Sequence, residues 1–219
     1  MDRPQPVSAE LASDLRNLRQ LNRYFGSHSL VAHFLRRWIL PGAKLRILDL
    51  ATGSGDIPRL VVDHAREVGA SVTVDAIDRQ SSTLEIARGL SAGYPEINFF
   101  EGDVLSFAEG SYELVLCSLA LHHFSETDAV RLLARCRELS SKFVLVADLQ
   151  RGLLATVGVY LLTALIFRDP MTRTDGRLSA ARSFSFPELR ALAERAGWKN
   201  FGHARFPYAR QALWLERKP

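Results

Sequence analysis

Three aspartates and two histidines are spaced so that they can bind a small polar molecule and deprotonate it. Asp49 and Asp78 lie at or near the ends of the apolar runs RILDL and VDAID, and Asp103 follows INFFEG. His122 and His123 come directly after the run ELVLCSLAL. Carboxylates accept hydroxyl groups and attract ammonium groups, and the pKa of histidine lies near neutrality, which suits a general base. These residue types therefore indicate a ligand site with a proton acceptor beside it.

A glycine turn follows the first of these aspartates. In ATGSGDI, residues 51–57, Gly53 and Gly55 lack a Cβ atom, so backbone N–H groups can approach a ligand closely. The N-terminus of the helix expected next favours negative charge, which suits either a phosphate or a carboxylate. A dinucleotide fingerprint would need glycine or alanine three residues after Gly55, where Pro58 stands. The turn therefore disfavours a pyrophosphate.

Asp49 and Asp78 narrow the choice of ligand. The Asp49 carboxylate would repel a pyrophosphate but attract a ligand that also carries an ammonium group, and an amino acid moiety carries both charges. A carboxylate in the position of Asp78, at the end of the second strand, accepts the hydroxyls of a ribose. We therefore expect the site to bind an amino acid end together with a nucleoside.

The elements that position these residues alternate between helix and strand. Helical periodicity predicts helices over 8–40, in one or two pieces around Gly26, and over about 57–68, 82–91, 125–139 and 185–196. Short apolar runs predict strands at Lys44–Leu50, Ser71–Ile77, Ile97–Phe100, Tyr112–Ser118 and Phe143–Ala147, with two more around His203 and Leu213. This order predicts a doubly wound α/β fold: a mostly parallel seven-stranded sheet with helices on both faces.

Length and composition set the broader class of protein. A chain of 219 residues with 47% hydrophobic and 24% charged residues is expected to form a single folded domain over residues 1–219. The start, MDRPQPVSAE, lacks the apolar stretch of a secretory signal, so we expect a cytoplasmic location. Cys117 and Cys136 match neither a disulfide framework nor a zinc pattern and are expected to be buried thiols. We expect no metal site.

Four motifs in order resemble the class I S-adenosylmethionine-dependent methyltransferases. They are DLATGSGDI, VDAID, Glu101–Asp103 and ELVLCSLALHHF, and the resemblance covers residues 44–150 well. It is nearest to small-molecule enzymes, including those that act on ubiquinone and menaquinone precursors or on polyketides. The resemblance implies a Rossmann-like methyltransferase fold, S-adenosylmethionine as the cofactor and S-adenosylhomocysteine as its product.

The resemblance also implies roles for residues of the glycine turn and the next two loops. Asp49 and the turn, with Ala51 where many members have glycine, then Thr52, Gly53 and Gly55, would hold the methionine part. Asp78 would take both ribose hydroxyls, with Arg79 beside the adenine. Asp103 would accept the adenine amino group, and the Val104 N–H would bind a ring nitrogen. Ser118 and Leu119 would contact the cofactor mainly through their backbone.

Four residues are candidates for the catalytic step. His122 and His123 follow the fourth strand, where the methyl group should lie, and either can act as a base for a hydroxyl acceptor. The alternative is that one packs under the rim of the sheet and the other bonds a loop carbonyl. Asp148 and Arg151, expected just past the fifth strand, would bind or deprotonate a phenolic acceptor, but Asp148 would equally suit the cap of a following helix.

Two segments are expected to form a helical cap, residues 8–40 and 151–184. Residues 152–167, GLLATVGVYLLTALIF, are 16 apolar or small residues, short of the roughly 20 that span a bilayer. We expect them to cover the site and to select an apolar acceptor such as a phenol, quinol or polyketide-like lipid. Core packing or a homodimer interface explains them equally well. Within Asn22–Gly26, either Arg23 or Tyr24 would reach the cofactor, unless this stretch is a solvated helix end.

Three rival functions remain at this point. The net charge is +4, and residues 168–218 hold 11 Lys or Arg against 5 Asp or Glu, which would suit an RNA-binding methyltransferase. The apolar segment and the scattered arginines argue against nucleic acid as a partner, so a small-molecule substrate is expected. A nicotinamide-dependent oxidoreductase is opposed by Pro58 and Asp49. A non-catalytic module that binds S-adenosylmethionine is excluded only by an activity assay.

Overall fold

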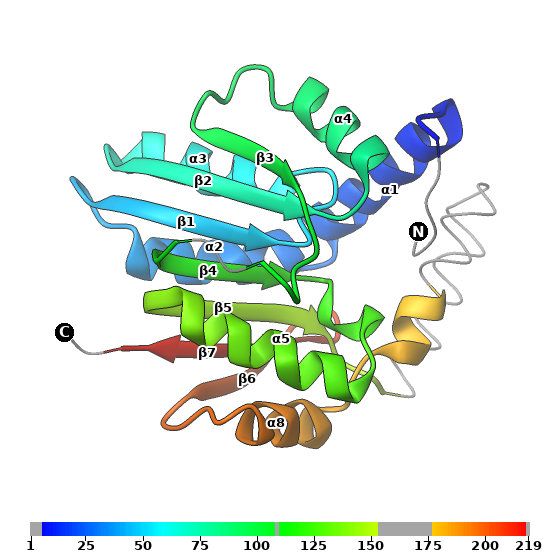
Figure 1. Ribbon diagram of the computed structural model, residues 1–219, viewed down its shortest axis with the longest axis vertical. Coiled ribbons are helices and arrows are strands. Elements are labelled where there is room, and N and C mark those ends of the chain that lie inside the picture. Colours follow the sequence, from blue (N-terminus) through cyan, green and yellow to red (C-terminus); the bar gives the residue numbers. More distant parts are fainter. Residues whose placement is uncertain (1–5, 108–109, 153–176, 218–219) are drawn as a thin grey trace.

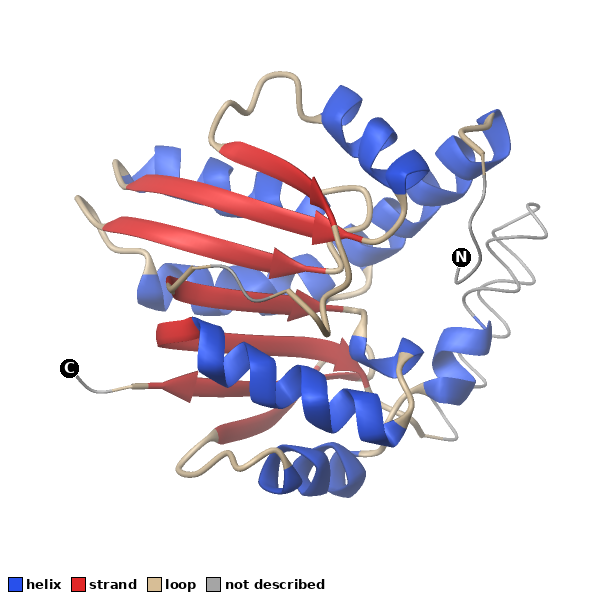
Figure 2. Cartoon of the chain, in the orientation of Figure 1, coloured by secondary structure: helices blue, strands red, loops and turns tan. Residues whose placement is uncertain are grey.

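The computed structural model describes residues 6–107, 110–152 and 177–217. Seven strands form one sheet in the order β3-β2-β1-β4-β5-β7-β6, and β1 to β5 run parallel (Figure 1). β7 is antiparallel to both β5 and β6. Helices cover both faces of the sheet (Figure 2). The predicted doubly wound, mostly parallel sheet is therefore confirmed.

The bounds of the elements agree closely with those expected. The strands are β1 Lys44–Leu50, β2 Ser71–Asp78, β3 Ile97–Glu101, β4 Tyr112–Ser118, β5 Ser140–Leu149, β6 Gly202–Phe206 and β7 Arg210–Glu216. The helices are α1 Ala9–Tyr24, α2 Ser27–Trp38, α3 Asp56–Val68, α4 Ser81–Leu90, α5 Glu126–Leu139 and α8 Phe186–Arg195, with a short 3₁₀ helix η1 Leu121–His123. Residues 177–182 are also helical.

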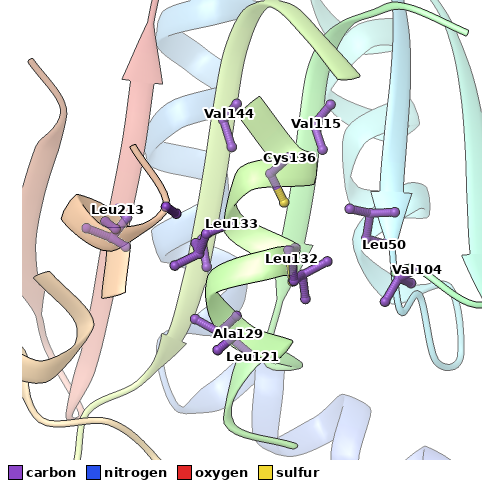
Figure 3. Packing of buried hydrophobic residues seen from close by; sticks show 14 of the residues in the cluster. Leu50, Val104, Val115, Leu121, Ala129, Leu132, Leu133, Cys136, Val144 and Leu213 are labelled. Carbon is purple, nitrogen blue, oxygen red and sulfur yellow. The ribbon is translucent and has the colours of Figure 1, made fainter. Parts of the chain in front are cut away.

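Two apolar clusters, one on each face of the sheet, hold the layers together. α2 and α3 pack on one face, and α5 and α8 contribute to the cluster on the other. Figure 3 shows the second cluster, in which Leu132 and Cys136 of α5 pack with Val115 and Val144 of the sheet. Side chains alternate along each strand, so neighbouring residues enter opposite clusters. Cys117 and Cys136 are buried free thiols, as predicted, and burial raises the pKa of Cys136 to about 12.

The N-terminal helical stretch divides at Gly26, one of the two arrangements expected. Gly26 has φ of 86°, a conformation that favours glycine, and it forms the N-cap of α2. A Cβ atom there would lie 3.1 Å from the ring of Tyr208 and 3.2 Å from the carbonyl of Pro207. The break therefore lets α2 begin directly against the turn between β6 and β7.

The fifth strand is longer than predicted. β5 begins at Ser140, which pairs with Tyr112 of β4, and continues through Asp148 to Leu149, which pairs with Arg210 of β7. Asp148 therefore belongs to the strand and does not cap a following helix. The polar residue is accommodated there because both oxygens of its carboxylate accept hydrogen bonds, as described below.

The apolar segment 152–167 lies outside the described residues, apart from Gly152, so its predicted capping role stays a prediction. Within the described ranges, each helix is too short or too polar to span a bilayer.

Candidate functional site

The carboxyl ends of the parallel strands bring most of the predicted site residues to one edge of the sheet. β1 lies between β2 and β4, with Asp49 level with Ala76 on one side and Leu116 on the other. The glycine turn after β1 reaches towards β2, because the N–H of Thr52 donates to the carbonyl of Ile77 at 2.9 Å. This edge, where loops follow β1, β2, β4 and β5, is where ligands bind in open α/β sheets.

Asp78 is tied to the glycine turn. Its Oδ2 accepts from the N–H of Gly53 at 2.9 Å, and its Oδ1 accepts from the N–H of Gln80 at 3.0 Å. Each carboxylate oxygen can accept a second hydrogen bond, so Asp78 retains the capacity to accept hydroxyls. The structure therefore brings Asp78 and the turn together, while Arg79 is exposed beside them.

Asp49 is a buried carboxyl group next to the same turn, with 2% of its surface exposed. Burial raises the pKa of Asp49 to about 7, and the negative charges of Asp56 and Asp78 act in the same direction. The polar hydroxyl of neighbouring Thr52 acts in the opposite direction. A cationic group bound here would stabilise the charged carboxylate, so the position fits the ammonium group of an amino acid.

The backbone around Asp49 and at the end of β4 adopts left-handed conformations. Ala51 has φ of 57° and Leu119 has φ of 54°, which for residues other than glycine costs about 1–2 kcal/mol each. Ala51 stands where many members of the methyltransferase family that the sequence resembles have glycine. Its positive φ is a conformation that glycine adopts without strain, which accounts for the preference for glycine. Such strained positions cluster at ligand sites.

Ser118 and Leu119 end β4 on the same edge. The Leu119 N–H donates to the carbonyl of Ala147 at 2.8 Å, so the backbone group left for a ligand at Leu119 is its carbonyl. The Ser118 hydroxyl is buried and has no hydrogen-bond partner in the described part of the chain. A buried hydroxyl without a partner is costly, so Ser118 fits a polar contact to a bound molecule.

Asp103 forms a turn after β3. Its Oδ1 accepts from the N–H of Leu105 at 2.9 Å, which is the turn-forming bond expected of aspartate. This bond engages one of the two carboxylate oxygens. Val104, the next residue, is buried with 5% exposure and packs into the core cluster beside α5.

His122 and Asp148 form a buried pair. The Nδ1 atom of His122 lies 2.6 Å from Oδ1 of Asp148, and the His122 N–H donates to Oδ2 at 3.0 Å. The side chains are 2% and 3% exposed. Nε2 of His122 has no hydrogen-bond partner among the described residues. An ionised Asp148 holds the proton on Nδ1, which leaves Nε2 with a lone pair that can accept a proton.

His123 and Arg151 are both exposed at the surface. His123 is exposed, and its ring centroid is 4.3 Å from that of His122. Arg151 pairs with Glu188 at 2.5 Å, with both side chains 44% exposed. Glu188 also accepts from the Ser185 N–H in the capping box of α8. Arg151 is therefore engaged at the surface and not with His122.

One contact at this edge was not anticipated from the sequence. Asp56, the first residue of α3, accepts from Asn22 Nδ2 at 3.0 Å, and its Oδ2 lies 2.9 Å from His28 Nε2. Burial on its own would raise the pKa of Asp56, but the bonds to His28 and Asn22 lower it overall. Asn22 rather than Arg23 or Tyr24 therefore links α1 to the helix that follows the glycine turn. In the sequence, the one indication of this contact is an aspartate, Asp56, at the start of the helix that follows the glycine turn.

Comparisons with known proteins agree with this geometry. Residues 47–142 match the family described as a methyltransferase domain. A 2-phytyl-1,4-naphtoquinone methyltransferase from Thermosynechococcus vestitus is 32% identical over 101 residues, which is 45% of this chain and 44% of that protein. The uncharacterized methyltransferase YcgJ from Bacillus subtilis is 29% identical over 108 residues, 48% of this chain and 41% of that protein. The chain thus spans less than half the length of these curated relatives.

A solved structure extends the likeness to the whole fold. The plantazolicin methyltransferase BpumL, solved in complex with a monoazolic desmethylPZN analogue and S-adenosylhomocysteine, superposes with a TM-score of 0.69 at 12% identity. The match covers 95% of this chain and 90% of that one. The elements outside residues 47–142, including α2, β6 and β7, therefore belong to the same fold.

Proposed function

We propose that this chain, which carries a class I S-adenosylmethionine-dependent methyltransferase domain, methylates oxygen or carbon on a small phenolic or quinol-like molecule. When bound, S-adenosylmethionine supplies an electrophilic methyl group on a sulfonium. The chain must bind that cofactor, bind the acceptor and remove a proton. The observation that carries the proposal is the arrangement at one sheet edge: the glycine turn with Asp49 and Asp78 next to the buried His122–Asp148 pair.

The residues around the turn fit the cofactor. The Asp49 carboxyl, with a pKa raised to about 7 by burial, gains a partner when an ammonium group binds. Asp78 accepts ribose hydroxyls with the lone pairs that Gly53 and Gln80 do not use. Asp103 presents its second carboxylate oxygen to the adenine amino group. In this proposal the exposed side chain of Arg79 lies beside the adenine ring.

His122 is the base in this proposal, and Asp148 positions it. The bond from Asp148 fixes both the orientation of the ring and the nitrogen that carries the proton, so Nε2 accepts a proton from an acceptor hydroxyl. His123 is exposed where His122 is buried, so we assign it to the rim of the site. Arg151 is assigned to the rim as well, through its pair with Glu188.

The acceptor class rests on two supports. The similar protein from Thermosynechococcus vestitus is named for a naphthoquinone substrate. The apolar residues 152–167 follow β5 in sequence, and in our proposal they and α1–α2 cap the acceptor. We therefore propose an acceptor with an aromatic ring.

Calorimetry and a transfer assay test the proposal. Titration with S-adenosylhomocysteine is expected to give saturable heat with a single site. Incubation with methyl-labelled S-adenosylmethionine and a panel of phenols and quinols is expected to label at least one of them. Folded protein that gives no heat with the product would refute the cofactor assignment, and binding without any labelling would refute the acceptor class.

A further inference from the structure

Arg210 is a buried cation at the edge of the sheet that carries the candidate site. It is the first residue of β7, and 8% of its surface is exposed. Its Nε donates to the hydroxyl of Ser27 at 2.9 Å, and its Nη1 donates to the carbonyl of Tyr208 at 2.9 Å. Burial lowers the pKa of Arg210 to about 10. The guanidinium is therefore held in one orientation and is poorly solvated.

No carboxylate of the described residues forms an ion pair with this guanidinium, and its Nη2 makes no hydrogen bond there. The acidic group whose charge acts on Arg210 is that of Asp148. Both oxygens of Asp148 are engaged elsewhere, with the ring and backbone of His122. A buried cation without an anion is unfavourable, so this position favours a negatively charged partner from beyond the described residues.

The N-terminus of α2, which carries a partial positive charge, lies next to Arg210. Ser27, which accepts the Arg210 bond, is the first residue of the 12-residue helix α2. Its N-cap is Gly26 without a side-chain cap, and the first turn of α2 holds no acidic residue. A helix N-terminus carries a partial positive charge, so the guanidinium and the start of α2 both favour an anion at this place.

The position of β7 in the sheet says which ligand carries that anion. Arg210 pairs with Leu149 and lies on the α2 face of the sheet, whereas Asp148, one residue earlier in β5, lies on the α5 face. Both are at the same end of β5, and the charge of Asp148 acts on Arg210. Asp49 is on β1 and the glycine turn follows it, and three strand spacings, about 14 Å, separate β1 from β7. The amino acid end expected at Asp49 is thus remote from Arg210, whereas an acceptor that lies across the end of β5 from His122 would meet it.

We propose that Arg210 and the N-terminus of α2 bind a carboxylate of the methyl acceptor, which makes the preferred acceptor a phenolic carboxylic acid. This inference rests on the function proposed above and deepens it. The aromatic part of the acceptor faces the His122–Asp148 pair, and its carboxylate takes the place of the missing counter-ion. Because the cation is already buried and oriented, little further desolvation or ordering opposes the binding.

Matched pairs of acids and esters test the charge requirement. Protein saturated with S-adenosylhomocysteine is titrated with 4-hydroxybenzoate, 2-hydroxybenzoate and 6-hydroxy-2-naphthoate, and with the methyl ester of each. At least one acid is expected to bind tenfold or more tightly than its ester. Equal affinities throughout, or no binding of any acid to protein that binds S-adenosylhomocysteine, would overturn the inference.

Variants assign the preference to Arg210. Arg210→Gln is expected to abolish the preference for the acid while the affinity for S-adenosylhomocysteine stays within twofold. Arg210→Lys keeps the charge and is expected to retain part of the preference. Arg205→Gln removes the same charge from an exposed position on neighbouring β6 and is the matched control, with the preference unchanged.

The outcomes separate this inference from the proposed function. Wild-type protein that fails to bind S-adenosylhomocysteine contradicts the proposed function itself. A large loss of S-adenosylhomocysteine affinity in Arg210→Gln, with the acid preference intact, assigns the carboxylate to the cofactor and overturns the inference. If circular dichroism shows that Arg210→Gln is unfolded, Arg210→Lys and Ser27→Ala decide: the first replaces the guanidinium by an ammonium, the second removes the partner of Nε, and each must reduce the preference.

Discussion

The ring of His122 and the carboxylate of Asp148 are joined at 2.6 Å inside the protein, although one residue follows β4 and the other lies in β5. Asp148 Oδ2 also accepts the backbone N–H of His122, and Oδ1 accepts that of Leu149 at 2.7 Å. The carboxylate therefore fixes a side chain and two backbone segments at once. Such a pair can either brace the sheet edge or hold a base in position, and kinetics distinguish the two roles.

Replacement of Asp148 by Asn is expected to lower kcat by about a hundredfold or more, the range typical of a general base that loses its orientation. The amide keeps the shape of the side chain but has a single acceptor oxygen, so it cannot accept from both the ring and the backbone N–H of His122, and the ring loses its fixed orientation or tautomer. We expect S-adenosylhomocysteine affinity to stay within a few fold. Steady-state kinetics over a pH series, alongside calorimetry, measure both quantities.

His64→Asn is the control for that experiment, because His64 lies on α3 and contacts the carbonyl of Ile39, away from the site edge. It should leave kcat unchanged. A purely bracing role for Asp148 predicts a lower melting temperature for Asp148→Asn with normal kcat and an unaltered pH profile. That result would remove His122 as the base.

The Asp49 carboxyl predicts a dependence of stability on pH. Its pKa is about 7 in the folded protein against an ordinary 3.8, so between pH 4 and 7 the folded state holds a proton that the unfolded state has lost. The contribution of this group to the free energy of unfolding therefore falls as pH rises through that window. Asp49→Asn removes the effect and should stabilise the ligand-free protein at pH 8 by up to about 4 kcal/mol.

The same substitution should have the opposite effect on ligand binding. The neutral amide of the Asp49→Asn variant cannot pair with an ammonium group, so S-adenosylhomocysteine affinity is expected to fall, while wild-type affinity should rise with pH up to about 7. Urea unfolding and calorimetry at pH 5 and pH 8 check both effects. Asp63→Asn, at an exposed site on α3, is the control. Equal stability differences at the two pH values would show that Asp49 is ionised throughout.

Asp78→Ala is expected to weaken S-adenosylhomocysteine binding by tenfold or more. The substitution removes the acceptor for the ribose hydroxyls and also frees the N–H groups of Gly53 and Gln80, so the turn loses its side-chain link to β2. The loss of these two bonds should cost about 1–3 kcal/mol of stability. Calorimetry at a temperature where circular dichroism confirms folding isolates the binding effect. Affinity equal to that of Asp63→Ala would place the ribose elsewhere.

Hydrophobic patterning was sufficient to predict the sheet, because β1, β2, β4 and β5 are buried on both faces over most of their length and appear as short apolar runs. The end of β5 was missed for the same reason: Asp148 interrupts the apolar run, and its partner His122 is 26 residues away in sequence. The pairing of His122 with Asp148 depends on β4 and β5 being neighbours in the sheet. A local sequence pattern does not predict this.

The candidate site was predictable only in part. The glycine turn, Asp49 and Asp78 lie next to strand ends, so their convergence follows from the parallel sheet. Arg210 had no such signal, because it lies in the basic C-terminal quarter among other arginines. Its burial arises from α2 packing at Gly26 against the turn before β7. Arg210 of β7 and Ser27 of α2 are far apart in the sequence, so no motif or spacing along the chain indicates that they meet.

Two substitutions in the glycine turn should change stability in opposite directions. Ala51 has φ of 57°, so Ala51→Gly relieves the left-handed strain and should stabilise the protein by about 0.5–1 kcal/mol after the entropy cost of glycine. Gly55 has φ of 71°, and a Cβ atom there would lie 3.0 Å from the Phe99 ring and 3.3 Å from Arg59 Nη1. Gly55→Ala should therefore destabilise it by about 1–3 kcal/mol.

Urea unfolding of the two variants checks these signs, and Gly89→Ala serves as the control because a Cβ atom on α4 meets nothing within 4 Å. That control should gain a little stability from helix propensity, about 1 kcal/mol or less. If the turn conformation is the one that binds the ligand, Ala51→Gly retains S-adenosylhomocysteine affinity and Gly55→Ala loses it. A stabilised Gly55→Ala would mean that the turn relaxes away from Phe99, and the backbone geometry assigned to the site would then be wrong.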